Sequence, residues 1–220
     1  MKITVVGEAK ASFQPELAVV HLSLGHESGD LDRAVEKASE LADAMNTEFQ
    51  NLRAKDPCPV TETVLLALST RSWRPYAQDG SQLPYRHRAS SRAKLTFNNF
   101  RELSAFIDTW GREDGVSVER VRWKLTDERE EAEKSRVLAD AVANARDRAE
   151  VLAEAAGAGA VTFVELSDAP FPDSGESQPM AFAAGAMARG AAGGGRGEGV
   201  DLTPEDIEVH STVHARFTTA

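Results

Sequence analysis

Apolar and polar residues alternate near both ends of the chain, and this pattern limits the fold more than any other feature. Near the C-terminus the alternating series is Ile207, Val209, Ser211, Val213, Ala215 and Phe217. Near the N-terminus the corresponding series is Ala18, Val20, Leu22 and Leu24. A period of two is typical of a strand with one buried face. We therefore expect both ends of the chain to contribute half-buried strands to one sheet.

The segment before the N-terminal series also reads as a strand, from Ile3 to Phe13, and Gly7 suits a β-bulge in it. Pro15 and Glu16 supply turn residues between the two strands. The first two strands are therefore predicted to pair as a hairpin.

Three amphipathic segments predict helices. The first runs to Leu52 with Asp30 as its N-cap. The second is opened by Asn99 and Glu102, which fit a capping box, and ends near Gly111. The longest runs from Thr126 to a stop at Gly157. Its predicted apolar stripe is Leu138, Val142, Ala145, Ala149, Leu152 and Ala156. Its first turns, 127–136, are almost wholly charged and either overhang the body in solvent or meet another chain.

The middle of the chain predicts further strands. Val60–Thr70 is rich in β-formers, and Trp73–Ser81 reads as a long hairpin tip with its turn at Asp79-Gly80. In the return strand, 89–97, mainly apolar residues alternate with polar ones, which predicts one buried face and one face exposed to solvent. Val116–Leu125 and Val161–Leu166 are also predicted as strands, and 168–200 as a flexible loop rich in Gly, Ala and Pro.

The predicted order is β-β-α-β-β-α-β-α-β-loop-β. Short turns between strands, with helices between some of them, indicate an α+β fold in which helices pack on one face of a mostly antiparallel sheet. With 220 residues and a mass of 23.7 kDa, the chain can form a single domain over 1–220, or two subdomains sharing an interface.

Charge and targeting signals narrow the function. The net charge of -10 disfavours phosphate backbones, so we expect no nucleic-acid partner. The apolar start of the chain is interrupted by Gly7 and ended by Glu8, which does not suit a secretory signal. No stretch is apolar enough to span a membrane, and the expected location is cytoplasmic.

Several of these strings together resemble the SIMPL-domain family, which includes bacterial oxidative-stress-defence and periplasmic immunogenic proteins. The strings are Ile3–Gly7, Pro15-Glu16, the aromatic hairpin with its return strand and helix over 73–110, the alanine-rich helix 139–157, and the strands 161–166 and 207–217. The resemblance covers nearly the whole chain.

The resemblance implies an α+β fold and, from some relatives, assembly into large ring- or channel-like oligomers. It supplies no catalytic residues to carry over. Many relatives are secreted, and the lack of a recognisable signal peptide here puts a role in the cell envelope in doubt.

The chemistry-bearing residues form no recognisable catalytic motif. His210 and His214 are four residues apart, but on a strand this spacing spans about 13 Å, too far to share a zinc ion. Cys58 has Asp56 and no basic residue beside it, which favours an incidental surface thiol, although its reactivity stays open. We therefore expect no metal, no cofactor and no enzymatic activity.

Two hypotheses remain. The favoured one is a non-enzymatic protein that forms homo-oligomers or binds a protein partner, linked to stress defence by family analogy. Met180, Phe182 and Met187 in the late loop could contact an apolar groove, although that loop is equally well explained by disorder. The alternative is a small-molecule sensor or enzyme with a pocket near the hairpin. Its predicted contact residues are Trp73, Tyr76, Tyr85 and Arg88.

Overall fold

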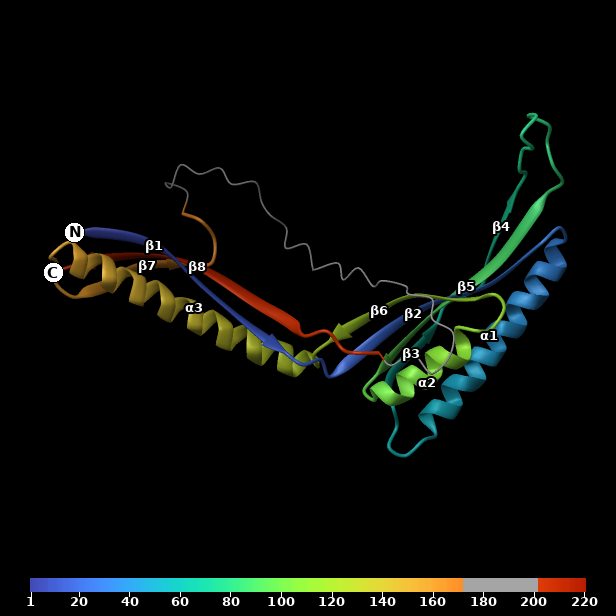
Figure 1. Cartoon of the computed structure of the whole chain (residues 1–220), viewed down its shortest axis with the longest axis horizontal. Coiled ribbons are helices and arrows are strands. Elements are labelled where there is room, and N and C mark those ends of the chain that lie inside the picture. Colours follow the sequence, from blue (N-terminus) through green and yellow to red (C-terminus); the bar gives the residue numbers. More distant parts are fainter. Residues whose placement is uncertain (172–201) are drawn as a thin grey trace. The chain divides into compact units, whose positions relative to one another are not determined.

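The structure is a computed structural model that describes residues 1–171 and 202–220 (Figure 1). Its contacts divide the described chain into two compact units. Unit 1 comprises Met1–Phe13, 127–171 and Glu208–Ala220, and unit 2 comprises Gln14–Thr126 and 202–207. Each unit contains its own antiparallel sheet backed by helix, so the α+β class is confirmed, with two sheets in place of the single one expected.

Unit 2 holds the larger sheet. Its elements are β2 (Leu17–Ser28), α1 (Leu31–Arg53), β3 (Val60–Leu65), β4 (Ser69–Trp73), β5 (Arg86–Phe97), α2 (Phe100–Trp110) and β6 (Val116–Lys124). The strands lie in the order β3-β5-β2-β6, and β4 also pairs with β5. The central pair is antiparallel, with Ala18 opposite Phe97 and Ser28 opposite His87.

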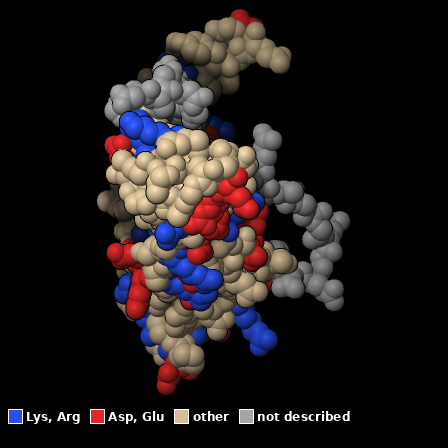
Figure 2. All heavy atoms as spheres, turned by 90° about the vertical axis from the view of Figure 1, so that its left-hand side faces the viewer, with Lys and Arg blue, Asp and Glu red and all other residues tan. Residues whose placement is uncertain are grey.

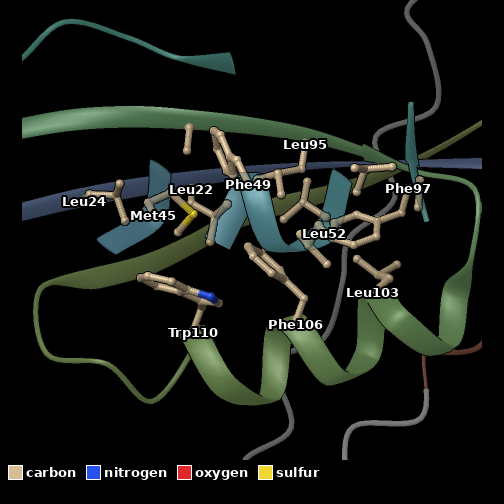
Figure 3. Close-up of a cluster of buried hydrophobic side chains, with 14 residues drawn as sticks. Leu22, Leu24, Met45, Phe49, Leu52, Leu95, Phe97, Leu103, Phe106 and Trp110 are labelled. Carbon is tan, nitrogen blue, oxygen red and sulfur yellow. The ribbon is translucent and has the colours of Figure 1, made fainter. Parts of the chain in front are cut away.

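Both helices of unit 2 cover the same face of this sheet. Strand residues Leu22, Leu24, Leu95 and Phe97 point toward them. The helices contribute Met45, Phe49 and Leu52 from α1 and Leu103, Phe106 and Trp110 from α2 (Figure 3). The predicted dry face of β5 is confirmed, since Ala89, Ser91, Ala93, Leu95 and Phe97 are all buried. The core of unit 2 is thus built from large side chains.

Unit 1 combines strands from distant parts of the sequence. Its elements are β1 (Lys2–Phe13), α3 (Asp127–Ala155), β7 (Val161–Ser167) and β8 (Ile207–Thr219). The strand order is β1-β8-β7, so the last strand pairs with the first. The expectation that the alternating series 18–24 and 207–217 share one sheet is wrong, since the first lies in β2 of unit 2 and the second in β8 of unit 1. Helix α3 packs on one face of this sheet, chiefly along β1. Val213, Ala215 and Phe217 are buried beneath it.

The apolar stripe of α3 differs from the prediction. Its buried residues are Val137, Ala141, Ala145, Ala149 and Ala153, whereas Leu138 and Leu152 are exposed. The reason is the close approach of α3 to β1 at Gly7. A Cβ atom at Gly7 would lie 2.2 Å from the carbonyl oxygen of Ala141 and 2.6 Å from the Cβ of Ala145. Only small side chains fit such an approach, so the alanines, not the leucines, face the sheet. Gly7 lies within β1, at the position where α3 comes closest to the strand.

Local signals at the helix ends are confirmed. The carboxylate of Asp30 accepts hydrogen bonds from the backbone N–H groups of Asp32 and Arg33, and Asn99 caps α2 in the same way through Arg101 and Glu102. Gly157 follows α3 with a φ of 68°. The predicted β1–β2 hairpin is wrong, since these strands belong to different sheets. The expected single strand over 60–70 is divided, with β3 ending at Leu65 and β4 beginning at Ser69.

Candidate functional site

The aromatic hairpin lies at the end of β4 and β5 in unit 2. Trp73 is the last residue of β4 and lies opposite Arg86. Beyond it the tip is closed by a bridge between Tyr76 and Gln82, and Gly80 turns the chain with a φ of 82°. The side chain of Asp79 accepts hydrogen bonds from the hydroxyl and the N–H of Ser81, which hold the pKa of this carboxyl below its ordinary value.

A shallow hollow of about 250 Å³ lies at the base of this tip. It is lined by Gly29, Pro75, Leu83, Pro84, Tyr85 and Arg86. The ring of Tyr85 lies 5.3 Å from the guanidinium of Arg74 and 6.2 Å from the ring of His87. Of the four residues predicted for a pocket here, only Tyr85 lines the hollow. The arrangement can stack against a planar or anionic group, but it encloses little volume.

Trp73, Tyr76 and Arg88 lie elsewhere on the hairpin. Tyr76 is 67% exposed, and Arg88 lies opposite Arg71 on one side and Glu27 on the other. Sequence reasoning also missed a contact between Ser72 and His87, whose Oγ and Nδ1 atoms are 2.7 Å apart. A serine activated for catalysis needs its histidine oriented by a third group. Among the described residues, no carboxylate hydrogen-bonds to His87, so the pair gives no support for hydrolysis.

On the open face of the sheet in unit 2, turned away from α1 and α2, most of the charged side chains are cationic, with Glu27 and Glu62 as acids on the same face. This face, here called the basic face, includes Arg71 of β4, Arg88, Arg92 and Lys94 of β5, and Arg120 and Arg122 of β6. His21 of β2 lies between Lys94 and Arg120. Partial burial and the positive charges of Arg120, Arg122 and Lys94 lower the pKa of His21. Sequence alternation in each strand signalled a wet face, but not that these strands are neighbours.

Strand β7 forms an edge of the sheet in unit 1. Within the described residues it pairs only with β8, and the register shifts between Phe163 and Glu165. Phe163, Val164 and Leu166 are 38%, 63% and 50% exposed. Figure 2 views unit 1 from the side where both termini lie, and uncharged residues (tan) gather there. An edge strand offers unpaired backbone groups, and apolar side chains along it favour pairing with another chain.

The charged start of α3 buries no apolar residue before Val137. Its side chains pair along the helix, with Glu130 at 2.5 Å from Lys134 and Glu133 at 3.8 Å from Arg129. Acidic residues in the first turn also favour the positive end of the helix dipole. This segment is therefore stabilised within its own helix, whether or not another chain meets it.

The remaining predicted positions yield no site. Met180, Phe182 and Met187 lie outside the described residues, as does most of the predicted loop 168–200. His210 and His214 both face away from α3 on β8, and Cys58 is a free, exposed cysteine. Across 1–171 and 202–220 no three His, Cys, Asp or Glu side chains are grouped to hold a metal ion. None of the helices in those ranges has the length and hydropathy of a membrane-spanning helix.

Comparison with known proteins gives one result. The model of a family described as "SIMPL: Protein of unknown function (DUF541)" matches residues 3–217, nearly the whole chain. No curated protein matches the sequence.

Proposed function

The chain belongs to the SIMPL family, whose function is unknown, and we propose that within it this protein acts without catalysis, as an oligomeric assembly or binding protein. The observation that carries the proposal is the edge strand β7. Three of its side chains, Phe163, Val164 and Leu166, stay exposed, and Glu165 is its one charged residue. Natural edge strands are usually protected by charges, and this one has few.

Two copies of β7 would pair edge to edge about a two-fold axis. Such an interface is isologous, because the same surface serves both partners. Pairing would satisfy the outer backbone groups of β7 and bury its exposed apolar side chains. Glu165 would not oppose it strongly, because its carboxylate is already 2.9 Å from Arg216 of β8.

The test is the mass of the protein in solution. Light scattering after size-exclusion chromatography should give the intact chain a mass above the 23.7 kDa of one copy. The double variant Val164→Lys/Leu166→Lys should return the mass toward one copy, because lysines at a strand edge oppose pairing. Val151→Lys is the matched control, since Val151 is 65% exposed on α3. A monomeric intact chain, or an equal effect of the control, would contradict the proposal.

The hollow at the hairpin favours a second candidate, a small-molecule sensor or enzyme. Tyr85, Arg74 and His87 together offer stacking and positive charge there. A thermal-shift screen would test it by comparing the intact chain with Tyr85→Ala. Tyr76→Ala is the control, because Tyr76 does not line the hollow. Hits that survive Tyr85→Ala would reject this pocket.

The proposal also covers the cellular role and the location of the protein. The proposed link with stress defence comes from analogy with the family. A cytoplasmic location goes with the proposal. Fractionation of cells followed by immunoblotting would test the location, and recovery of the protein in the envelope fraction would overturn it.

A further inference from the structure

We propose that the basic face of unit 2 binds single-stranded nucleic acid. This inference does not rest on the proposed assembly, since the two surfaces belong to different units. It rests on the arrangement of the cations, on their lack of acidic partners and on the chemistry of the side chains between them.

The cations lie in rows along neighbouring strands. Arg88, Arg92 and Lys94 share one face of β5, and Arg120 and Arg122 share the same face of β6. Same-face neighbours in a strand are about 7 Å apart, and adjacent strands are about 5 Å apart. β2 lies between these two strands and contributes no cation of its own there. Its side chains on this face are Val19, His21, Ser23 and Glu27, and Glu27 lies opposite Arg88, 3.5 Å from Arg86. The result is two basic rows with a strip between them that carries one acid, at the end near β4.

Most of these cations lack an acidic partner. Lys94 is 2.8 Å from Glu62, but among the described residues no carboxylate forms an ion pair with Arg92, Arg120 or Arg122. Arg71 and Arg88 lie directly opposite each other on β4 and β5. Like charges directly opposite each other destabilise a sheet. Glu27 of β2, on the other side of Arg88, offsets part of this repulsion, and an anionic ligand would relieve the rest.

His21 marks the middle of the face, because it lies opposite Lys94 of β5 on one side and opposite Arg120 of β6 on the other. Partial burial and then the charges of Arg120, Arg122 and Lys94 lower its pKa, while Glu119 acts in the opposite sense. The cations of both rows therefore lie close enough to act on the strip between them.

The chemistry of the face suits a phosphate polymer better than a protein or a membrane. Protein interfaces place apolar anchors at their centre, whereas the centre here is His21 among arginines. A membrane is a broad plane, whereas these cations follow strands in a sheet that twists. Arginine forms bidentate hydrogen bonds with phosphates. Trp73 lies on the same face, opposite Arg86, and offers a ring on which a base can stack.

The net charge of -10 argued against such a ligand, but it averages over surfaces of opposite sign. Acidic residues concentrate on helices, for example Asp32, Glu36, Glu40 and Asp43 on α1, which covers the other face of the sheet. At physiological salt, charges are screened over about 8 Å. A strand lying on the basic face therefore meets mainly the local cations.

The experiment measures binding of a fluorescein-labelled oligothymidylate by anisotropy. The intact chain should bind it, with affinity falling between about 50 and about 200 mM salt. The triple variant Arg92→Gln/Arg120→Gln/Arg122→Gln should bind at least about tenfold more weakly. It should also reduce the slope of log affinity against log salt by about 2, since each single-strand phosphate contact contributes about 0.7.

The matched control removes as many arginines from the rest of unit 2. Arg33→Gln/Arg101→Gln/Arg112→Gln changes exposed residues on or after α1 and α2 and should leave binding within about twofold of the intact chain. Arg92→Lys/Arg120→Lys/Arg122→Lys keeps the charge and should keep most of the binding. Four results would overturn the inference: no binding at the lower salt, an equal loss in the control, stronger binding of anionic lipid vesicles, or equal binding of polyglutamate. Circular dichroism confirms that each variant is folded.

Discussion

In both units a helix packs on a sheet, but the helix side chains at the main contact differ in size. Unit 2 fills the space between its helices and sheet with Leu95, Phe97, Phe106 and other large side chains. Unit 1 brings α3 against β1 through Gly7 and a row of alanines. A core of large side chains loses stability when they are trimmed, because cavities form. A close contact of small residues loses stability when anything is added, because no space exists for it.

The exposed sheet faces differ as well. In unit 1, cross-strand charges are of opposite sign, with Arg216 2.9 Å from Glu165 and Lys10 3.7 Å from Glu208. Unit 2 also has cross-strand pairs of opposite charge, Lys94 with Glu62 and Arg86 with Glu27. In addition, Arg71 lies opposite Arg88, and Arg92, Arg120 and Arg122 form no ion pair among the described residues. Unit 1 thus neutralises its own surface, whereas unit 2 leaves a surplus of positive charge on one face.

The largest effect is expected from trimming the core of unit 2. Phe97→Ala should reduce the free energy of unfolding by about 3–5 kcal/mol, because Phe97 is fully buried between β5 and the helices. Trp73, Trp110 and Trp123 all lie in unit 2, so tryptophan fluorescence in urea reports on this unit. A loss below about 1 kcal/mol would show that the large core is not what stabilises unit 2.

The complementary change enlarges the small core of unit 1. Gly7→Ala should cost about 1–3 kcal/mol, because the new methyl group would overlap the backbone of α3. Hydrogen exchange should show faster exchange in β1 and α3, while the fluorescence midpoint of unit 2 stays unchanged. Gly29→Ala is the control, since nothing lies within 4 Å of a Cβ atom there. If Gly7→Ala were as harmless as Gly29→Ala, the close contact would be disproved.

Exchanging the charge patterns of the two faces tests the second contrast. Arg71→Glu should stabilise unit 2 by about 0.2–1 kcal/mol, because it places opposite charges across β4 and β5. Glu165→Lys should destabilise unit 1 by a similar amount, because it places a cation opposite Arg216. Urea midpoints measure both, and changes of the same sign in the two variants would contradict the contrast.

The smallest effect concerns His21 and depends on pH. Its pKa in the folded protein lies below the ordinary 6.5, so the unfolded chain takes up the proton first as the pH falls. Protonation therefore destabilises the fold below about pH 6.5. We compare the melting temperature of His21→Gln with that of the intact chain at each pH. The difference in favour of the variant should be larger at about pH 5 than at about pH 8. Differential scanning fluorimetry measures this, and a difference that does not change with pH would exclude the effect.

Local chemistry made much of this fold predictable. Asp30 and Asn99 cap their helices through nearby N–H groups, and Gly157 ends the longest helix, so each acts within a few residues of itself. The alternation in β5 and β8 likewise predicted which side chains are buried. These features follow from neighbours in sequence and need no knowledge of distant segments.

Distant partners decided what could not be predicted. Pro15 suggested a hairpin, but β1 pairs with β8, which lies at the other end of the sequence. Leu138 and Leu152 are more apolar than the alanines beside them, yet the space left at Gly7 excludes them. The basic face and the Ser72–His87 contact depend on which strands are neighbours and on their register. Residues close in sequence predict neither the strand order nor the register.

The pairing of β1 with β8 also determines the order in which the two units can fold during synthesis. All of β2 to β6 leaves the ribosome before α3, so unit 2 can fold while synthesis continues. β1 ends at Phe13 but its partner begins only at Ile207, so at about 5–20 residues per second the delay is on the order of 10–40 s. During that interval β1, in which apolar and polar residues alternate, has no β8 with which to pair. Chaperone capture during translation is therefore expected at β1.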